Sequence, residues 1–247
     1  GSGQAETLLF RLARGTGLHG AAGIRPSRPG YLRPLLCLTR ADTEAVCRAC
    51  GERWVTDETN DADDYARNRL RHGALPALCG VNSAAERNLA RFCEKAAKAD
   101  EYFARQADAL LASAVKSVVK DSMTQQQKLR AVYDYAKNTF GYLGIGAADT
   151  SKSDWALTSA TDMLKTHKGN CYSWAAGFTY LARQVGFDAQ AIPGTGVSPK
   201  GSESVHAWTE ITIDGTAYTF DPQIESVYKK RYNENYDLFM KKYGEAV

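Results

Sequence analysis

Three residues in the C-terminal half of the chain have the types and the order that catalysis by a thiol requires. They are Cys171, His206 and Asp221. A thiol becomes a strong nucleophile when a nearby base ionises it, and the base works best when a third group fixes the orientation of its ring. The sequence therefore predicts a triad in which Asp221 orients His206 and His206 takes the proton of Cys171.

Cys171 stands where a helix is expected to begin. Asn170 precedes it and is a favourable N-cap residue, and apolar residues follow at helical spacing at Trp174, Phe178 and Leu181. Unpaired N–H groups and the positive end of the helix dipole at such a position favour the thiolate over the thiol. A cysteine on an apolar helix is by itself more often a buried small residue, so its neighbours in space decide its role.

The other two residues belong to a predicted β-hairpin. Residues 204–213 alternate as a half-buried strand does and include His206, and an Asp-Gly turn signal follows them. A second strand, residues 217–220, leads directly into Asp221. A hairpin brings the end of its second strand beside its first strand, so Asp221 should reach His206. A lone strand histidine is more often structural, and Phe-Asp-Pro alone is a turn signal, so the order of all three residues carries the prediction.

These segments together resemble the catalytic core of the transglutaminase-like superfamily. They are G-N-C-Y-S-W-A, V-H-A-W-T-E-I and I-D-G-T-A-Y-T-F-D-P, and their order and spacing match over roughly residues 115–236. The resemblance implies a papain-like α+β fold, in which the helix bearing Cys171 packs on an antiparallel sheet that bears His206 and Asp221. It also implies acyl transfer on protein or peptide amides through a thioester, by hydrolysis or by transamidation. The backbone N–H of Cys171 is expected to supply part of the oxyanion hole.

Metal-binding patterns have weaker support in the sequence. Only His167 lies near Cys171 at ligand spacing, and we expect His167 to be a surface residue of a loop. Cys47 and Cys50 form a C-x-x-C pair, but no second pair completes a zinc site, and one turn of an ordinary helix explains them. No calcium-loop pattern is present, so the sequence predicts neither a metal site nor a cofactor.

The basic residues and the cysteines divide the chain into two segments. Residues 1–110 hold 14 Arg and 2 Lys, whereas residues 111–247 hold 3 Arg and 12 Lys. Five of the six cysteines lie in the first segment. This shift predicts a mostly helical first segment joined to the cysteine domain. Five cysteines in a helical segment are not typical of a disulfide framework, which favours a reducing compartment and a cytoplasmic protein.

The first segment resembles tRNA(Ile)-lysidine synthetase over roughly residues 4–110. The shared motifs include Q-A-E-T-L-L, R-G-T-G and Y-A-R-N-x-x-R-H. The Ser-Gly-Gly-x-Asp-Ser loop that cradles ATP in that family is absent, so we do not expect lysidine ligation from this chain. The resemblance places Arg67, Asn68, Arg71 and His72 in a tRNA-facing motif. Weak contact with tRNA and a solvated basic helix face are both open for these residues.

Length, charge and hydropathy set limits on the class of protein. The 247 residues allow one large domain or two modest ones, and a net charge of +3 is too small to indicate nucleic-acid binding by itself. No apolar run approaches the roughly 18 residues of a membrane span, and no signal peptide is visible. The leading Gly-Ser-Gly is typical of a tag remnant, which leaves the natural N-terminus open. The alternatives to an enzyme are a non-catalytic binding domain and an RNA-associated protein, and the sequence does not fix the oligomeric state.

The apolar pattern also predicts the elements around the triad. A long amphipathic helix is expected over residues 82–119, and helical structure throughout residues 113–139. Another helix is expected over residues 155–165, and a turn followed by a strand over residues 186–192. Residues 193–204 are rich in Gly, Ser and Pro, which predicts a flexible loop that borders a substrate cleft just before the histidine.

Overall fold

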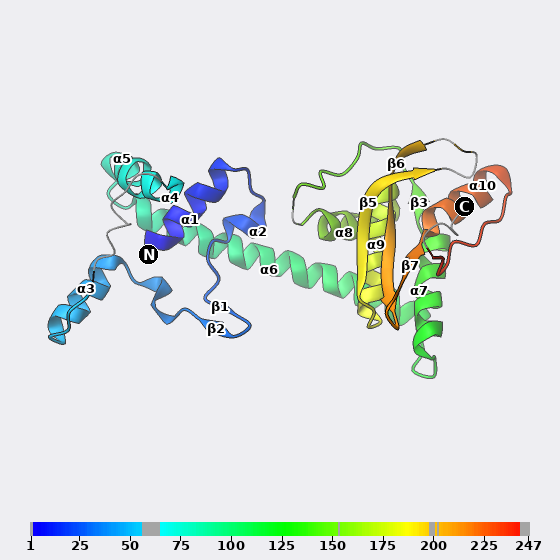
Figure 1. The fold of residues 1–247 in the computed structure, drawn as a ribbon, viewed down its shortest axis with the longest axis horizontal. Coiled ribbons are helices and arrows are strands. Elements are labelled where there is room, and N and C mark those ends of the chain that lie inside the picture. Colours follow the sequence, from blue (N-terminus) through cyan, green and yellow to red (C-terminus); the bar gives the residue numbers. More distant parts are fainter. Residues whose placement is uncertain (1, 56–64, 153, 198–200, 202, 243–247) are drawn as a thin grey trace. The chain divides into compact units, whose positions relative to one another are not determined.

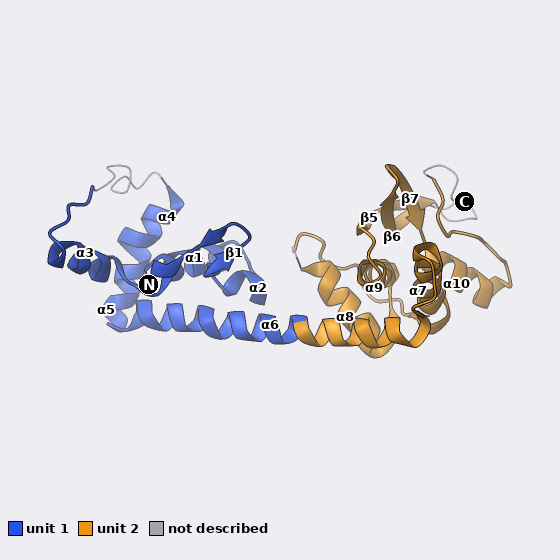
Figure 2. Ribbon diagram, turned by 90° about the horizontal axis from the view of Figure 1, so that it is seen from below, with its two compact units in different colours: residues 1–104 blue, residues 105–247 orange. Residues whose placement is uncertain are grey.

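The computed structural model describes residues 2–55, 65–152, 154–197, 201 and 203–242. The chain divides into two compact units, residues 1–104 and residues 105–247 (Figures 1 and 2). Helix α6 (Ala85–Val118) contributes residues to both units. Within the described ranges, none of the helices combines the length and the apolar composition needed to cross a membrane.

The first unit is mostly helical and has a small core. Its elements are α1 (Ser2–Ala13), α2 (Leu18–Ala21), β1 (Ser27–Arg28), β2 (Tyr31–Leu32), the 3-10 helix η1 (Pro34–Cys37), α3 (Arg40–Ala49), α4 (Ala66–Arg69), the π-helical turn η3 (Leu70–Ala74), α5 (Leu75–Val81) and the first part of α6. The buried residues of its core are Leu8, Ala21, Cys93 and Ala96. This core joins α1 and α2 to α6.

The second unit is an α+β domain, which confirms the fold class predicted for it. Its elements are the end of α6, α7 (Gln125–Thr139), β3 (Gly141–Tyr142), α8 (Trp155–Thr166), β4 (Lys168–Gly169), α9 (Cys171–Gln184), β5 (Ala189–Val197), β6 (Glu203–Ile213), β7 (Thr216–Phe220) and α10 (Pro222–Tyr232). Strands β5, β6 and β7 form an antiparallel sheet in that order. Strand β3 pairs in parallel with β4, just before α9.

Helix α9 lies at the centre of the second unit, beside the sheet (Figure 1). Its apolar residues Trp174, Phe178 and Leu181 are buried, and they pack with side chains from α7, α8 and the sheet. Full burial of a side chain of this size is worth about 1.5–3 kcal/mol. Gly177 permits a close approach, because a Cβ there would come within 3.0 Å of the Phe140 ring. The helix is therefore fixed on several sides by apolar contact.

The continuous helix predicted over residues 113–139 is wrong. Helix α6 ends at Val118, and α7 begins at Gln125. The side chains and backbone N–H groups of Thr124 and Gln127 cap the start of α7 reciprocally. Such a capping box is a helix-start signal that is visible in the sequence, and here it prevails over the helical pattern that surrounds it.

The loop predicted over residues 193–204 is wrong in its described part. Strand β5 continues to Val197, and β6 begins at Glu203, so the glycine-rich stretch is largely paired strand. Pro193 lacks an N–H group, but β5 lies at the edge of the sheet and forms a ladder on one side only. The rest of the predicted loop lies partly outside the described residues. Pairing with β6 makes this segment a strand, and the composition does not reveal that pairing.

Candidate active site

The structure places His206 and Asp221 side by side. His206 lies on β6, and Asp221 directly follows β7, whose last residue pairs with Thr209 of β6. The Nε2 atom of His206 lies 2.6 Å from Oδ2 of Asp221, which is typical of a charge-assisted hydrogen bond. The two side chains are only 14% and 15% exposed. This is the placement that the hairpin predicts.

The carboxylate of Asp221 is held by more than the histidine. Its Oδ1 atom accepts hydrogen bonds from the backbone N–H groups of Gln223 and Ile224, each at 3.0 Å, and so caps the start of α10. The positive end of the helix dipole also favours a negative charge at this position. The backbone N–H of Asp221 donates to the carbonyl of Leu238 at 3.1 Å. These contacts fix the carboxylate and, through it, the imidazole.

Cys171 is the first residue of helix α9. Asn170 caps this helix as predicted, because its Oδ1 accepts the N–H of Ser173 at 3.1 Å. The first N–H groups of a helix have no partner within it, so hydrogen-bond donors gather around the start of α9. Cys171 is partly buried against a small apolar cluster that includes Ala175 and Ala207. Since Ala207 belongs to β6, this cluster joins the helix of the thiol to the strand of the histidine.

Asp221 and Cys171 both act on the ionisation of His206. Burial alone would lower the pKa of His206, but the charge and hydrogen bond of Asp221, followed by those of Cys171, raise it from 6.5 to about 10. Asp221 occupies Nε2, which leaves Nδ1 for a second partner. A pKa of about 10 keeps the imidazole protonated at neutral pH.

Two buried threonines fix helix α9 to strand β6. The hydroxyl of Thr209 donates to the carbonyl of Ala175 at 3.0 Å, and it lies 3.0 Å from the hydroxyl of Thr179. Both threonines are almost fully buried. Thr209 stands three residues after His206, and Ala175 stands four residues after Cys171. These hydrogen bonds thus help to set the separation of base and thiol, and no sequence motif marks them.

Two glycines of β5 leave room for side chains of β6. A Cβ on Gly196 would lie 3.1 Å from Cβ and 3.2 Å from Cδ2 of His206. A Cβ on Gly194 would lie 2.7 Å from the ring of Trp208. The glycines that composition assigns to a flexible loop therefore form the surface on which the imidazole and indole rings lie. In the sequence, the only sign of this arrangement is that the two glycines stand two residues apart, so that both face the same side of a strand. The sign can be interpreted only once the pairing of β5 with β6 is known.

The loop after β3 is tied to the start of α9. The Nδ2 atom of Asn170 donates to the carbonyls of Gly146 and Ile145 at 2.7 and 3.4 Å. The backbone N–H of Leu143 donates to the carbonyl of Gly169 at 2.8 Å. Leu143 and Ile145 are themselves exposed. Apolar side chains are therefore presented to solvent next to the helix that begins with the thiol.

The residues with weaker predictions belong to other elements than the three predicted catalytic residues. His167 is an exposed residue in the left-handed region, with φ of 54°, at the end of α8. Cys47 lies in α3 and Cys50 at its end, and all six cysteines are free thiols. Across the part of the chain that the structure describes, no group of three or more His, Cys, Asp or Glu side chains could hold a metal ion.

The proposed tRNA-facing residues lie in the first unit. Arg67 and Arg71 bind the nearly buried carboxylate of Glu6, with nitrogen–oxygen distances of 3.1 and 2.8 Å. Asn68 is buried. A buried carboxylate needs such partners, so both arginines have an internal role. Contact of these residues with RNA stays a prediction.

Comparison with known proteins finds a family for each part of the chain. Residues 112–222 match the transglutaminase-like superfamily, and residues 2–78 match the PP-loop domain. The tRNA(Ile)-lysidine synthase of Solibacter usitatus is 40% identical over 133 residues, which are 53% of this chain and 30% of that protein. The tRNA(Ile)-lysidine synthase of Aromatoleum aromaticum is 53% identical over 76 residues, 30% of this chain and 18% of that protein.

The chain spans less than a third of the length of these curated relatives. Among solved structures, a candidate cysteine protease from Cytophaga hutchinsonii is 24% identical, with a TM-score of 0.36. The similarity covers 47% of this chain and 37% of that chain.

Replacing Asp221 by Asn should lower the pKa of His206 from about 10 toward 6.5, because the amide has no charge to stabilise the imidazolium. The stability that protonated His206 gains is fully present below pH 6.5 and is lost as the pH rises through about 10. NMR titration of the imidazole Cε1–H measures the change. Asp162→Asn removes an exposed carboxylate of the same unit and is the control. An unchanged titration in Asp221→Asn contradicts the ion pair.

Gly196→Val should displace the imidazole, because its Cβ alone would already crowd His206. A misplacement of about 1 Å can cost roughly 100-fold in rate, so we expect Cys171 alkylation near neutral pH to slow by at least about tenfold. Peptide mass spectrometry measures the alkylation rate. Gly144→Val is the control, since a Cβ at Gly144 would meet nothing within 4 Å. Equal rates in the two variants would show that the glycine does not position His206.

Proposed function

We propose that Cys171, His206 and Asp221 transfer the acyl group of a protein or peptide amide, because residues 112–222 match the transglutaminase-like superfamily, after a segment that matches the PP-loop domain. The observation that carries the proposal is the 2.6 Å contact of His206 with Asp221, on the strand whose Ala207 packs in one cluster with Cys171. In the proposal, Cys171 is the nucleophile, His206 the base and Asp221 the orienting group.

The first half of the reaction forms a thioester. The thiolate of Cys171 attacks the amide carbon and forms a C–S bond, while the carbonyl electron pair moves to the oxygen. The backbone N–H of Cys171 stabilises this oxyanion at the start of α9. As the oxyanion collapses, the C–N bond breaks and protonated His206 gives its proton to the leaving nitrogen. An amine or ammonia departs.

The second half of the reaction releases the acyl group. Neutral His206 takes a proton from water or from an amine, and the oxygen or nitrogen attacks the thioester carbon. The C–S bond then breaks, which restores the thiolate beside the imidazolium. Water gives a carboxylic acid, and an amine gives a new amide bond. We place hydrolysis first, as a protease or amidase activity, and transamidation second.

Alkylation by iodoacetamide tests the pair directly. At about pH 6, Cys171 should react at least about tenfold faster than the other five cysteines, because the imidazolium stabilises its thiolate. His206→Ala should remove this advantage. The exposed Cys37 and Cys50 are internal controls in the same chain, and peptide mass spectrometry reads all sites at once. If Cys171 reacts no faster than these two, the triad is inactive and a binding domain becomes the better interpretation.

Product analysis then separates the two acceptors. A glutamine-containing peptide should release ammonia in water, and a primary amine probe such as dansylcadaverine should be incorporated only if transamidation competes. A peptide without side-chain amides tests cleavage of the backbone. Cys171→Ala must abolish every product that the chain forms, and His206→Ala should reduce it strongly.

The similarity to tRNA(Ile)-lysidine synthases favours a second candidate function, in which the first unit docks on tRNA. Binding of tRNA to the full chain should then be detectable at low salt and should weaken steeply as salt rises, because phosphate contacts release counterions. Filter binding at several salt concentrations measures this dependence. Absence of binding at low salt rejects this candidate and leaves the thiol chemistry untouched.

A further inference from the structure

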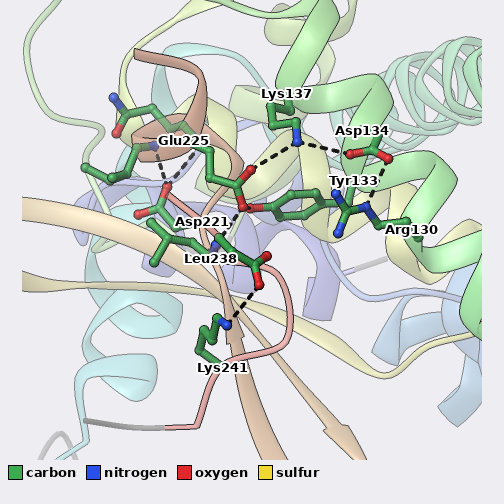
Figure 3. A network of polar contacts seen from close by, with 11 residues as sticks. Arg130, Tyr133, Asp134, Lys137, Asp221, Glu225, Leu238 and Lys241 are labelled. Carbon is green, nitrogen blue, oxygen red and sulfur yellow. Dashed lines mark hydrogen bonds and ion pairs between the residues drawn. The ribbon is translucent and has the colours of Figure 1, made fainter. Parts of the chain in front are cut away.

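Glu225 is a buried carboxylate to which the mechanism above gives no role. Its side chain is only 6% exposed. Its Oε1 accepts hydrogen bonds from the hydroxyl of Tyr133 at 2.5 Å and from the backbone N–H of Leu238 at 2.6 Å. Its Oε2 lies 3.0 Å from Nζ of Lys137. Figure 3 shows this carboxylate between helix α7 and the segment at Leu238. A charge so well enclosed and so fully paired is a strong geometric constraint on its neighbours.

Leu238 connects this carboxylate to the triad. Its N–H donates to Glu225, and its carbonyl accepts the N–H of Asp221 at 3.1 Å. Glu225 also lies in the first turn of helix α10, whose start Asp221 caps. A displacement of Glu225 would therefore reach Asp221 along two routes, through the Leu238 backbone and through the first turn of α10.

Helix α7 holds Glu225 in place through Tyr133. The ring of Tyr133 is fully buried and meets three other rings edge-on, with centroid distances of 5.1 Å to Phe239, 5.3 Å to Phe178 and 6.4 Å to Phe220. Phe178 lies on the helix of the thiol, and Phe220 directly precedes the aspartate of the triad. Burial and then the charge of Glu225 raise the pKa of Tyr133 well above 10, so its hydroxyl remains a donor at neutral pH. One side chain thus contacts both halves of the site and the buried carboxylate.

We propose that Glu225 is a positioning residue of the triad. Held by helix α7, it fixes the Leu238 backbone and the start of α10 so that Asp221 stays in contact with His206. The inference rests on the proposed function, since it takes Asp221 to be part of the catalytic triad. Its test reads the ionisation of His206 directly, and so it does not depend on finding a substrate.

Two substitutions separate position from charge. Glu225→Gln removes the charge but keeps an oxygen that can accept from Tyr133 and Leu238, whereas Glu225→Ala removes the acceptor. In NMR titrations of the full chain, we expect the pKa of His206 to change by less than about half a pH unit in Glu225→Gln. In Glu225→Ala it should fall by more than about one pH unit, because Asp221 is no longer held against the imidazole. Alkylation of Cys171 near neutral pH should slow in Glu225→Ala alone.

A second variant and a matched control complete the test. Tyr133→Phe keeps the ring and deletes one donor, so the pKa of His206 should fall in the same direction but less. Asp134→Asn is the matched control, because it changes the next residue of α7. Asp134 lies in the outer part of the network in Figure 3, 3.0 Å from Arg130 and 3.3 Å from Lys137. The Asp134→Asn substitution should leave the titration of His206 unchanged.

Several outcomes would overturn the proposal. One is an unchanged pKa of His206 in a folded Glu225→Ala protein, and another is an equal fall in the Gln and Ala variants, which would show an effect of charge alone. If Glu225→Ala does not fold, an unchanged titration in Tyr133→Phe overturns it. Absence of acyl transfer by the wild type would instead count against the proposed function, while the titration would still report on Glu225.

Discussion

The packing of helix α9 against the β5–β6–β7 sheet sets the distance on which the candidate site depends. The thiol stands on the helix, and the histidine stands on the sheet with the aspartate just beyond it, so neither element forms the site alone. Apolar burial supplies most of the force, but it has little directionality. The hydrogen bond from Thr209 to the carbonyl of Ala175 adds direction, because hydrogen bonds tolerate only a narrow range of geometry. A slip of the helix by one turn, about 5.4 Å, would separate the thiol from the imidazole.

Asp221 and Glu225 are enclosed carboxylates of this unit, and partners surround both of them. Asp221 accepts hydrogen bonds from the imidazole and from two backbone N–H groups of α10, and Glu225 accepts them from a phenol, an ammonium and a backbone N–H. Removing one partner of a buried charge typically costs 3–5 kcal/mol, roughly half the stability of an ordinary domain. The fixed orientation of the carboxylates is therefore maintained by the same contacts that make their burial tolerable.

Residues 2–78 match the PP-loop domain and residues 112–222 match the transglutaminase-like superfamily, and with the similarity to tRNA(Ile)-lysidine synthases these matches confirm both resemblances found in the sequence. In the first unit, the arginines of the family motif bind a buried glutamate, so part of that motif has a structural role in this chain. In the second unit, His206 and Asp221 are in contact, and Ala207 beside them packs in one cluster with the partly buried Cys171. The matched motif therefore contributes an internal ion pair in the first unit and a candidate site in the second.

The sequence by itself determined the features that depend on residues close together in the chain. Asn170 caps α9, and Asp214 and Gly215 both adopt positive φ, 50° and 76°, as the Asp-Gly turn signal predicts. From that hairpin the contact of His206 with Asp221 could be predicted. Only the tertiary structure decided which glycine-rich residues are strand, because they are extended through pairing with β6. It also decided the role of Glu225, whose donors on α7 lie 92 and 88 positions away in the chain, beyond the reach of any local pattern.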